Sequence, residues 1–272
     1  METMKYGYTI FDAHAHVFPQ KIAERATSSI STFYDDMPMC HVGSMEQLLE
    51  SGTNAGVDGF LICSTATNIT QVQAINQFLL STCRDYVNCI PFAAMHPFSP
   101  TCQADMEFIL QHPFRGIKLH PDFQKFNIDD PAADPLYDMI QESHLPILMH
   151  MGDPHQTYSH PKRLAAVLKR FPRLRVIAAH LGGWERWEEA MTYLKPDHRL
   201  RFDTSSCAPF LSKEKMRTMI RTYGAENCFF GVDFPMWDHA EELERFFALS
   251  LTEEENRKIL SENLIAWIHE TN

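Results

Sequence analysis

The sequence lacks any hydrophobic run long enough to cross a membrane. No apolar stretch among its 272 residues reaches the ~18–20 residues that a membrane-spanning helix needs. The first residues, METMKYGYTIFDAHAH, contain no basic segment followed by an apolar signal core. We therefore expect a soluble cytoplasmic protein with no membrane partner.

The chain also has no surplus of positive charge. Its 24 Lys and Arg are outnumbered by 35 Asp and Glu, which gives a formal net charge of −11. Such a chain repels phosphate backbones, so we expect no nucleic acid partner. A small substrate, even a carboxylated one, can still bind inside a locally cationic pocket.

A paired cysteine framework is missing as well. The seven cysteines are odd in number, scattered, and mostly set inside apolar runs such as FLIC and NCFFGV. This pattern is typical of reduced thiols in a cytosolic protein.

What is present is enough hydrophobic sequence for one large core. Hydrophobic residues make up 44% of the chain, and its length is close to the ~250 residues of a typical eight-fold barrel. We find no repeat, low-complexity segment or linker. Residues 1–272 are therefore expected to form a single domain.

Short apolar runs alternate with stretches of helical periodicity, which predicts parallel strands separated by helices. Eight such runs in this length favour a (β/α)₈ TIM barrel of the α/β class, with an open doubly wound sheet as the alternative. The eight strand candidates are YTIFDAHAH, GFLICS, CIPFAAMH, GIKLH, PILMH, RVIAAH, LRFDTS and CFFGVD.

Helix-start residues support this division of the chain. Pro161, Ser212 and Thr252 each stand where a helix is expected to begin. A last helix over roughly 252–269 should follow the eighth strand. The stretch of about 17–57 is longer than a usual helix with its loops, so we expect part of it to form a lid or a wall of the site.

Polar residues stand at the C-terminal ends of the candidate strands, where barrel enzymes build their active sites. In FDAHAH, His14 and His16 are two residues apart and should share an inward face, with the alanines between and before them turned toward the helices. His150, His180 and Asp233 end the fifth, sixth and eighth strands. Any one such histidine could be a hydrogen-bonded core residue, but four agreeing strand ends indicate a site.

Nitrogen and oxygen donors without an adjacent thiolate suit a divalent metal. Zn²⁺ is favoured, with Mn²⁺ or Fe²⁺ as alternatives, and an open coordination position would leave room for water.

The motifs DAHAH, ILMH, IAAHLGG and GVDFP together resemble the amidohydrolase superfamily over nearly the whole chain. The resemblance is greatest to the branch that includes aminocarboxymuconate semialdehyde decarboxylase, γ-resorcylate decarboxylase and uncharacterised TIM-barrel metal-dependent hydrolases. It implies that the metal is bound by His14, His16, His150 and Asp233. It also implies that His180 acts as a catalytic base or orients the attacking water.

The fourth strand, GIKLHP, allows two interpretations. In binuclear amidohydrolases a similarly placed lysine is carboxylated and bridges two metals, which would make His150 and His180 ligands of the second. Alternatively Lys118 stays an ammonium and, with His120, binds a substrate carboxylate. We favour the second slightly, because the rest of the chain resembles the mononuclear branch. A lysine that snorkels out of the barrel end is the weaker alternative.

Other residues have less certain roles. His96 ends the third strand and is a candidate for substrate binding or for a structural role, and Asp203 could support a metal ligand. Six further histidines are expected at the surface, and exposed aromatic residues would allow a homodimer. The histidines are His41, His112, His144, His198, His239 and His269, and the aromatic residues are Trp184, Trp187 and Phe210.

Three functions are compatible with these residues. The leading one is metal-dependent hydrolysis of a small amide, ester or lactone, in which Asp233 and His180 handle the protons. The second is a lyase that decarboxylates or hydrates a small unsaturated or aromatic acid, held by the cations Lys118, His120 and Lys125. The third is a catalytically silent metal-binding protein.

Overall fold

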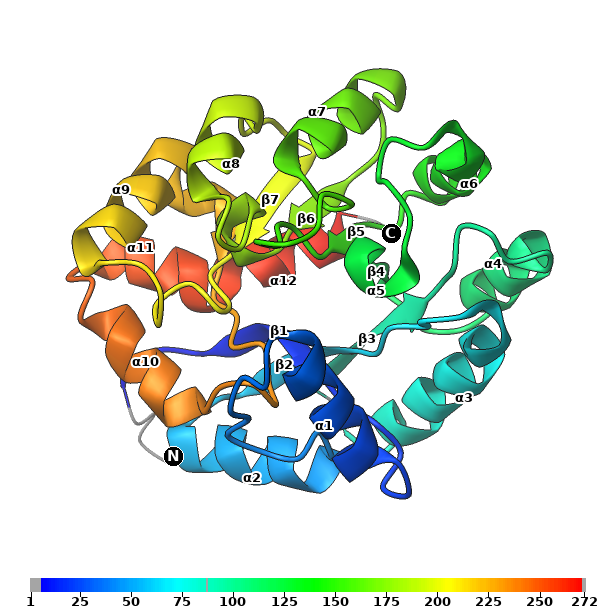
Figure 1. The fold of residues 1–272 in the computed structure, drawn as a ribbon. Helices are drawn as coiled ribbons and strands as arrows, with labels where there is room; N and C mark the ends of the chain where they lie inside the picture. The colour runs from blue at the N-terminus through cyan, green and yellow to red at the C-terminus, as the bar shows by residue number, and fades with distance from the viewer. Residues whose placement is uncertain (1–5, 87, 271–272) are drawn as a thin grey trace.

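The computed structural model describes residues 6–86 and 88–270 and contains the expected eight parallel strands (Figure 1). Each strand pairs with the next in sequence, from β1 through β8. The strands are β1 Phe11–His16, β2 Gly59–Cys63, β3 Cys89–Ala94, β4 Gly116–Leu119, β5 Ile147–Met149, β6 Val176–Ala178, β7 Leu200–Asp203 and β8 Cys228–Phe229. All eight candidate runs are confirmed as strands.

Backbone hydrogen bonds close the sheet into a barrel. β8 is only two residues long, but the chain beyond it continues beside β1. Ala13 N donates to Phe230 O at 2.8 Å, and Asp233 N donates to His14 O at 2.8 Å. The closed barrel confirms the fold expected from the sequence and excludes the open sheet.

Helices surround the strands, and Figure 1 shows them as an outer ring. The expected starts at Pro161, Ser212 and Thr252 are confirmed, because each begins or caps a helix. The α-helices are α1 Ala23–Phe33, α2 Met45–Ala55, α3 Val72–Cys83, α4 Cys102–Leu110, α5 Pro121–Gln124, α6 Asp134–Ser143, α7 Pro161–Arg170, α8 Trp187–Tyr193, α9 Lys213–Tyr223, α10 His239–Phe247, α11 Glu253–Arg257 and α12 Asn263–His269. The 3₁₀ helices are η1 Ile69–Gln71, η2 Pro131–Ala133, η3 His180–Gly182 and η4 Ala225–Asn227, and η5 Lys258–Glu262 is a π-helix.

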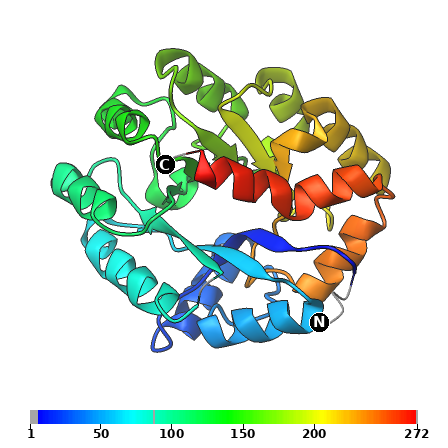
Figure 2. The same cartoon turned by 180° about the vertical axis from the view of Figure 1, so that it is seen from behind.

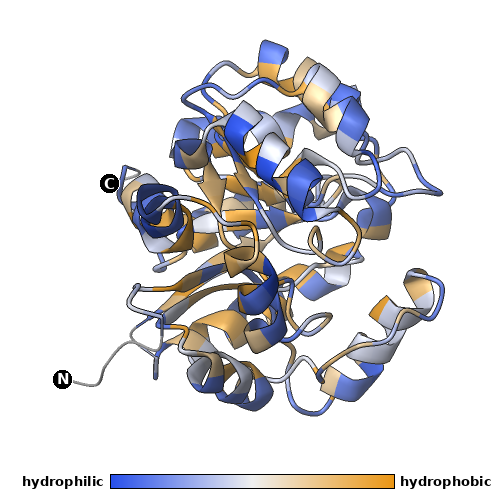
Figure 3. Ribbon diagram, turned by 90° about the vertical axis from the view of Figure 1, so that its left-hand side faces the viewer, coloured by the Kyte–Doolittle hydropathy of each residue, from blue (hydrophilic) through white to orange (hydrophobic). Residues whose placement is uncertain are grey.

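Apolar side chains fill the barrel and the layer between strands and helices. Hydropathy colouring shows that the central strands are mainly hydrophobic (Figure 3). The barrel interior includes Leu61, Phe92, Leu148, Ile177 and Phe229, and side chains of α12 join this cluster. The final run α11–η5–α12 crosses one end of the barrel (Figure 2). That end is therefore closed, and the functional site lies at the other.

The long segment between β1 and β2 contributes two different helices. α2 belongs to the outer ring, whereas α1 stands beside the open end of the barrel (Figure 1). Of the eleven residues of α1, only Ala23 and Thr27 are buried. The expectation that part of this segment forms a wall of the site is confirmed, because α1 lines the cavity described below.

Three sequence-based expectations about side-chain position are wrong. Trp184 and Trp187 are buried, at 6% and 9% exposure, so only Phe210 remains an exposed aromatic of the three. The alternation in FDAHAH is interrupted by a register shift between Asp12 and Ala15, and Ala13 joins the interior cluster. His239 is fully buried instead of lying at the surface.

The state of the cysteines agrees with the expectation from the sequence. All seven cysteines are free thiols. Within residues 6–86 and 88–270, no helix combines the length and the apolar character required to cross a bilayer.

Candidate metal centre

Two histidines and an aspartate meet at the open end of the barrel. His14 and His16 come from β1, and Asp233 comes from the loop after β8. His14 Nε2 lies 3.2 Å from His16 Nε2 and 3.5 Å from Asp233 Oδ1, and His16 Nε2 lies 3.3 Å from the same oxygen. Three of the four expected ligands are thus clustered.

These separations fit a shared divalent metal. Nitrogen and oxygen ligands lie about 2.0–2.2 Å from Zn²⁺, and a tetrahedron of that size has edges of roughly 3.3–3.6 Å. The three measured separations, 3.2, 3.3 and 3.5 Å, are close to this range. The donor set of imidazole and carboxylate also suits Mn²⁺ or Fe²⁺.

His14 is held in orientation from its other ring nitrogen. Its Nδ1 lies 3.1 Å from Asp203 Oδ2 and 3.0 Å from Ser205 Oγ. Since the carboxylate can only accept, Nδ1 carries the proton and Nε2 presents its lone pair to the cluster. Burial, together with the nearby positive charge of Lys118, lowers the pKa of His14 to about 4. The structure thus gives Asp203 the supporting position that the sequence suggested.

The Asp233 carboxylate is also fixed in orientation by hydrogen bonds. It adopts a left-handed backbone conformation with φ of 68°, and its Oδ2 accepts a hydrogen bond from Ser206 Oγ at 2.7 Å. Ser206 in turn accepts from Trp237 Nε1 at 2.9 Å. Burial alone would raise the pKa of Asp233, but His14 and His16 outweigh it and hold the pKa well below its usual range. Asp233 is therefore ionised, and its carboxylate carries no proton.

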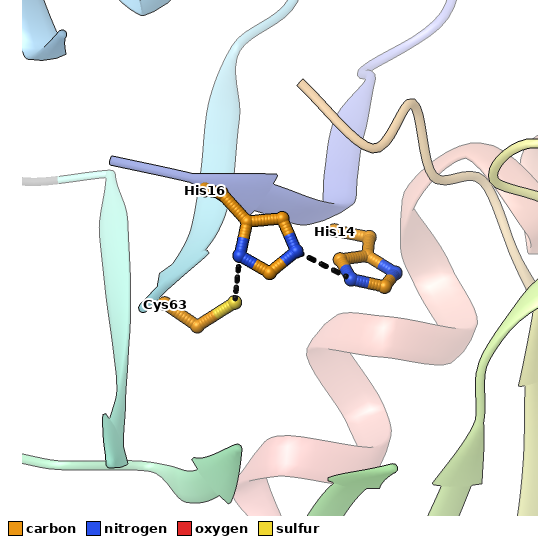
Figure 4. A group of neighbouring side chains, drawn as sticks. All are labelled: His14, His16 and Cys63. Carbon is orange, nitrogen blue, oxygen red and sulfur yellow. Dashed lines mark hydrogen bonds between the residues drawn. The ribbon is translucent and has the colours of Figure 1, made fainter. Parts of the chain in front are cut away.

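Cys63 lies beside this cluster without sharing its centre. Figure 4 shows the thiol against one edge of the His16 ring and His14 against the opposite edge. Cys63 Sγ is 3.6 Å from His16 Nδ1, whereas the clustered atom is His16 Nε2. Although these three side chains are close enough to hold an ion, the thiol is placed to orient His16.

His150 and His180, which follow β5 and β6, form a second pair. His150 Nε2–H donates to Gly152 O at 2.9 Å, and His180 Nδ1–H donates to Ser205 O at 3.0 Å. The remaining nitrogens, His180 Nε2 and His150 Nδ1, face each other at 3.0 Å. Two lone pairs at this distance require a proton or a cation between them. His150 is therefore near the cluster but is engaged with His180.

Lys118 reaches the same cluster from β4. It is 1% exposed, and its Nζ lies 2.9 Å from His14 Nε2. This burial contradicts the alternative in which the side chain snorkels to solvent. The single lone pair of His14 Nε2 cannot accept from Lys118 and bind a metal at once. Metal binding therefore requires this lysine to release His14, either by movement or by modification.

His120 follows β4 and lies over the histidine pair. Its ring stacks on His150 with centroids 3.8 Å apart and planes 8° apart, and its Nε2 lies 3.1 Å from Tyr34 OH. His120, Asp122 and His150 are near enough to be considered as a metal-binding group. Two stacked parallel rings cannot both direct in-plane lone pairs at one ion, so this group does not suit a metal.

A cavity of about 580 Å³ opens above these residues. His16, His120, His150 and Asp233 line it, together with residues of α1, η1 and α3. His14, Lys118 and His180 are not among the lining residues and lie beneath this surface. His96 is also absent from the lining; its Nδ1 accepts a hydrogen bond from Phe98 N at 3.3 Å. The structure therefore places the proposed substrate ligand His96 outside the cavity.

Besides Asp233, the acidic and basic side chains that line the cavity are Asp122, Arg25 and Lys125, and the sequence analysis missed Arg25. Asp122 is buried, and neither carboxylate oxygen has a hydrogen-bond partner among the described residues. Burial raises the pKa of Asp122 to about 7. Arg25 from α1 and Lys125 after α5 supply positive charge to the lining.

The sequence analysis also missed a buried hydrogen-bond network that involves Asp12 of β1 and His239. Asp12 Oδ1 accepts from the backbone N–H groups of His14 and Val232, both at 2.9 Å, and Asp12 Oδ2 lies 3.1 Å from His239 Nε2. His239 Nδ1 lies 2.7 Å from Ser51 Oγ. The network ties β1 to the segment that carries Asp233. No local signal marked His239, because only the tertiary placement of the first residue of α10, beside Asp12 and Ser51, buries it.

Fold and site together define a barrel enzyme with a metal-type donor cluster at the C-terminal ends of its strands. A family model described as Amidohydrolase matches residues 11–265. The chain belongs to this family, which confirms the resemblance read from its motifs.

Solved structures similar to this chain agree on the fold. An uncharacterised TIM-barrel protein from Bordetella bronchiseptica is 20% identical, with TM-score 0.77 and coverage of 97% of this chain and 99% of that one. A dihydroxybenzoic acid decarboxylase from Polaromonas with bound manganese is 13% identical, with TM-score 0.75 and coverage of 97% and 98%. A candidate 2-pyrone-4,6-dicarboxylic acid hydrolase from Pseudomonas putida is 16% identical, with TM-score 0.67 and coverage of 96% and 97%. No curated protein matches the sequence.

Proposed function

We propose that the protein is a metal-dependent hydrolase that cleaves a small, carboxylated amide, ester or lactone. The observation that carries this proposal is the cluster of His14 Nε2, His16 Nε2 and Asp233 Oδ1, each within 3.5 Å of the others, at the floor of a substrate-sized cavity. These residues would hold the metal, with His150 completing the set after it separates from His180. A bound divalent metal would lower the pKa of water and polarise a carbonyl group.

The chain's own residues supply the proton steps. Asp233 is held unprotonated by its histidine neighbours, so it can take a proton from the attacking water. Ser206 and the adjacent histidines fix the carboxylate, and the proton can then pass to the leaving amine or alkoxide. His180, beneath the cavity, would steady the negative charge that develops on the carbonyl oxygen.

The state of Lys118 would decide whether the site binds one metal or two. Lys118 contacts His14 Nε2, and the facing nitrogens of His150 and His180 could hold a second cation. A carboxylated Lys118 would join these two positions. If Lys118 remains an ammonium, one metal would be bound, and the lysine would have to move away from His14 before it could face the substrate's carboxylate.

Decarboxylation of a carboxylic acid is the second candidate. Two observations favour it: Arg25 and Lys125 place positive charge at the cavity, and several similar structures are described as decarboxylases. Positive charge there would orient a substrate carboxylate next to the metal.

Metal content per chain, measured on protein purified without chelator and on Lys118→Ala, tests the site. One metal unaffected by the substitution supports a mononuclear centre, and two metals that fall to one or none support the bridged centre. Absence of any metal would overturn the proposal. Acid release from ester, lactone and amide panels, recorded beside carbon dioxide release from aromatic and unsaturated acids, then separates hydrolysis from decarboxylation.

A further inference from the structure

The cavity is larger than a single-ring substrate needs. Its volume is about 580 Å³, whereas an apolar cavity of roughly 150 Å³ is sufficient to bind benzene. The side chains of the candidate metal centre, His16, His150 and Asp233, occupy only one part of the lining. A monocyclic acid held by them would therefore leave most of the cavity unfilled.

The remaining space lies along α1. Ile22, Ala26 and Ile30 recur every four residues, so they share one helix face, and Phe33 extends that face by one further turn. All four line the cavity. Ile22 and Phe33 are 37% and 36% exposed, so the chain's own packing leaves this apolar face partly uncovered.

A second part of the cavity wall is formed by η1 and the start of α3. It presents Thr70, Gln71, Ala74 and Ile75, none of which is charged. Arg25 is the charged side chain that α1 itself contributes to the lining. A charged group lying between these walls would have few partners, whereas hydrocarbon would meet apolar side chains on the α1 face.

We propose that this groove, between α1 on one side and η1 with α3 on the other, binds an extended hydrocarbon tail of the substrate. The proposal rests on the proposed function, since the reacting head of the same molecule would lie at His16, His150 and Asp233. The substrate class is therefore an amphiphilic acid derivative: a polar, cleavable head with an acyl or aryl-alkyl tail. Continuity of the groove with the candidate centre argues for the substrate as its occupant.

Binding of straight-chain carboxylates from butanoate to dodecanoate to the metal-loaded protein, measured by calorimetry, tests the proposal without requiring turnover. The dissociation constant should fall as the chain lengthens, by up to about fourfold per buried methylene, until the groove is filled. A dissociation constant that is independent of chain length would overturn the inference.

Variants of α1 locate the tail. Ala26→Trp should fill the groove and weaken the longer carboxylates selectively, leaving butanoate unchanged, and Ile30→Ala should weaken the longer ones more mildly. Ser28→Trp is the matched control, because Ser28 is exposed on α1 but does not line the cavity. Equal effects of Ala26→Trp and Ser28→Trp would contradict the proposal.

Two results separate this inference from the proposed function. A steep chain-length series with no hydrolysis in any panel would retain the groove and remove the hydrolase. Hydrolysis of single-ring substrates, together with dissociation constants that do not depend on chain length, would retain the hydrolase and remove the groove. Concentration-dependent dimerisation that Ala26→Trp abolishes would assign the α1 face to a second copy of the chain and overturn the proposal.

Discussion

The C-terminal ends of the barrel strands, here called the rim, and helix α1 lie at the same cavity. The two regions differ in how firmly the rest of the protein holds them. On the rim, His14 and Asp203 are fully buried and hydrogen bonded to each other. α1 buries two of its eleven residues, and the side chain of Thr27 anchors it by accepting from Gly43 N at 2.9 Å. Residues that perform chemistry need a preorganised support, whereas a wall that selects substrates can change shape at little cost in stability.

The contact between the two regions is mainly aromatic. Phe33 meets Phe123 edge to face with centroids 4.6 Å apart, and Tyr34 meets Trp184 at 5.1 Å. Tyr34 OH also reaches His120 on the rim. The C-terminal end of α1 is therefore joined to the rim by aromatic contacts, while its N-terminal half is held by the buried residues Ala23 and Thr27.

The largest effect is expected on turnover, for a substitution at the candidate metal centre. Asp233→Asn removes the proton acceptor while keeping its size, so turnover should fall by about 10²–10⁴-fold. Steady-state kinetics and metal analysis measure the change. Asp85→Asn, at an exposed position, is the control, and unchanged turnover in Asp233→Asn would remove this residue from the mechanism.

A matched pair of isoleucines tests the difference in packing. Ile177→Ala in the barrel interior should destabilise the protein by about 2–5 kcal/mol, since Ile177 is fully buried. Ile30→Ala on α1 should cost less than about 1 kcal/mol, because Ile30 is only partly buried. Denaturant unfolding measures both. Equal costs would show that α1 is packed as tightly as the barrel.

The hydrogen-bond network of Asp12 and His239 should matter both to stability and to the metal. His239→Ala leaves Asp12 Oδ2 buried without its partner, which should cost about 1–3 kcal/mol. Because Asp12 also holds the backbone of His14, metal affinity should fall by about 10–100-fold. Thermal unfolding and metal titration report the two effects, and His198→Ala at an exposed position is the control. Loss of stability with unchanged metal affinity would restrict the network to a structural role.

The smallest effect is expected where the two regions meet. Tyr34→Phe keeps the aromatic contacts and removes only the hydrogen bond to His120, so stability should fall by about 0.5–1.5 kcal/mol. Hydrogen exchange should show α1 amides exchanging faster than those of β1 in the wild type, and faster still in this variant. Similar protection of α1 and β1 would contradict the comparison.

Much of this protein could be predicted from local sequence. The alternation of apolar runs with helical periodicity specified eight strands, because strand and helix patterns are short-range properties. His14, His16, His150, His180 and Asp233 were identified because each stands at a strand end, and parallel strands of a barrel bring their C-terminal ends to one rim. The family followed from the same motifs.

Other features depended on contacts between distant segments. His239 is 227 residues from Asp12, and only the tertiary placement of the first residue of α10 makes them partners. The contact of Lys118 with His14, the pairing of His150 with His180 and the position of His96 outside the cavity likewise depend on side-chain directions that no local pattern specifies. Sequence periodicity determined which residues reach the rim, and tertiary packing decided which of them touch, because hydrogen bonds require a geometry that the whole barrel must supply.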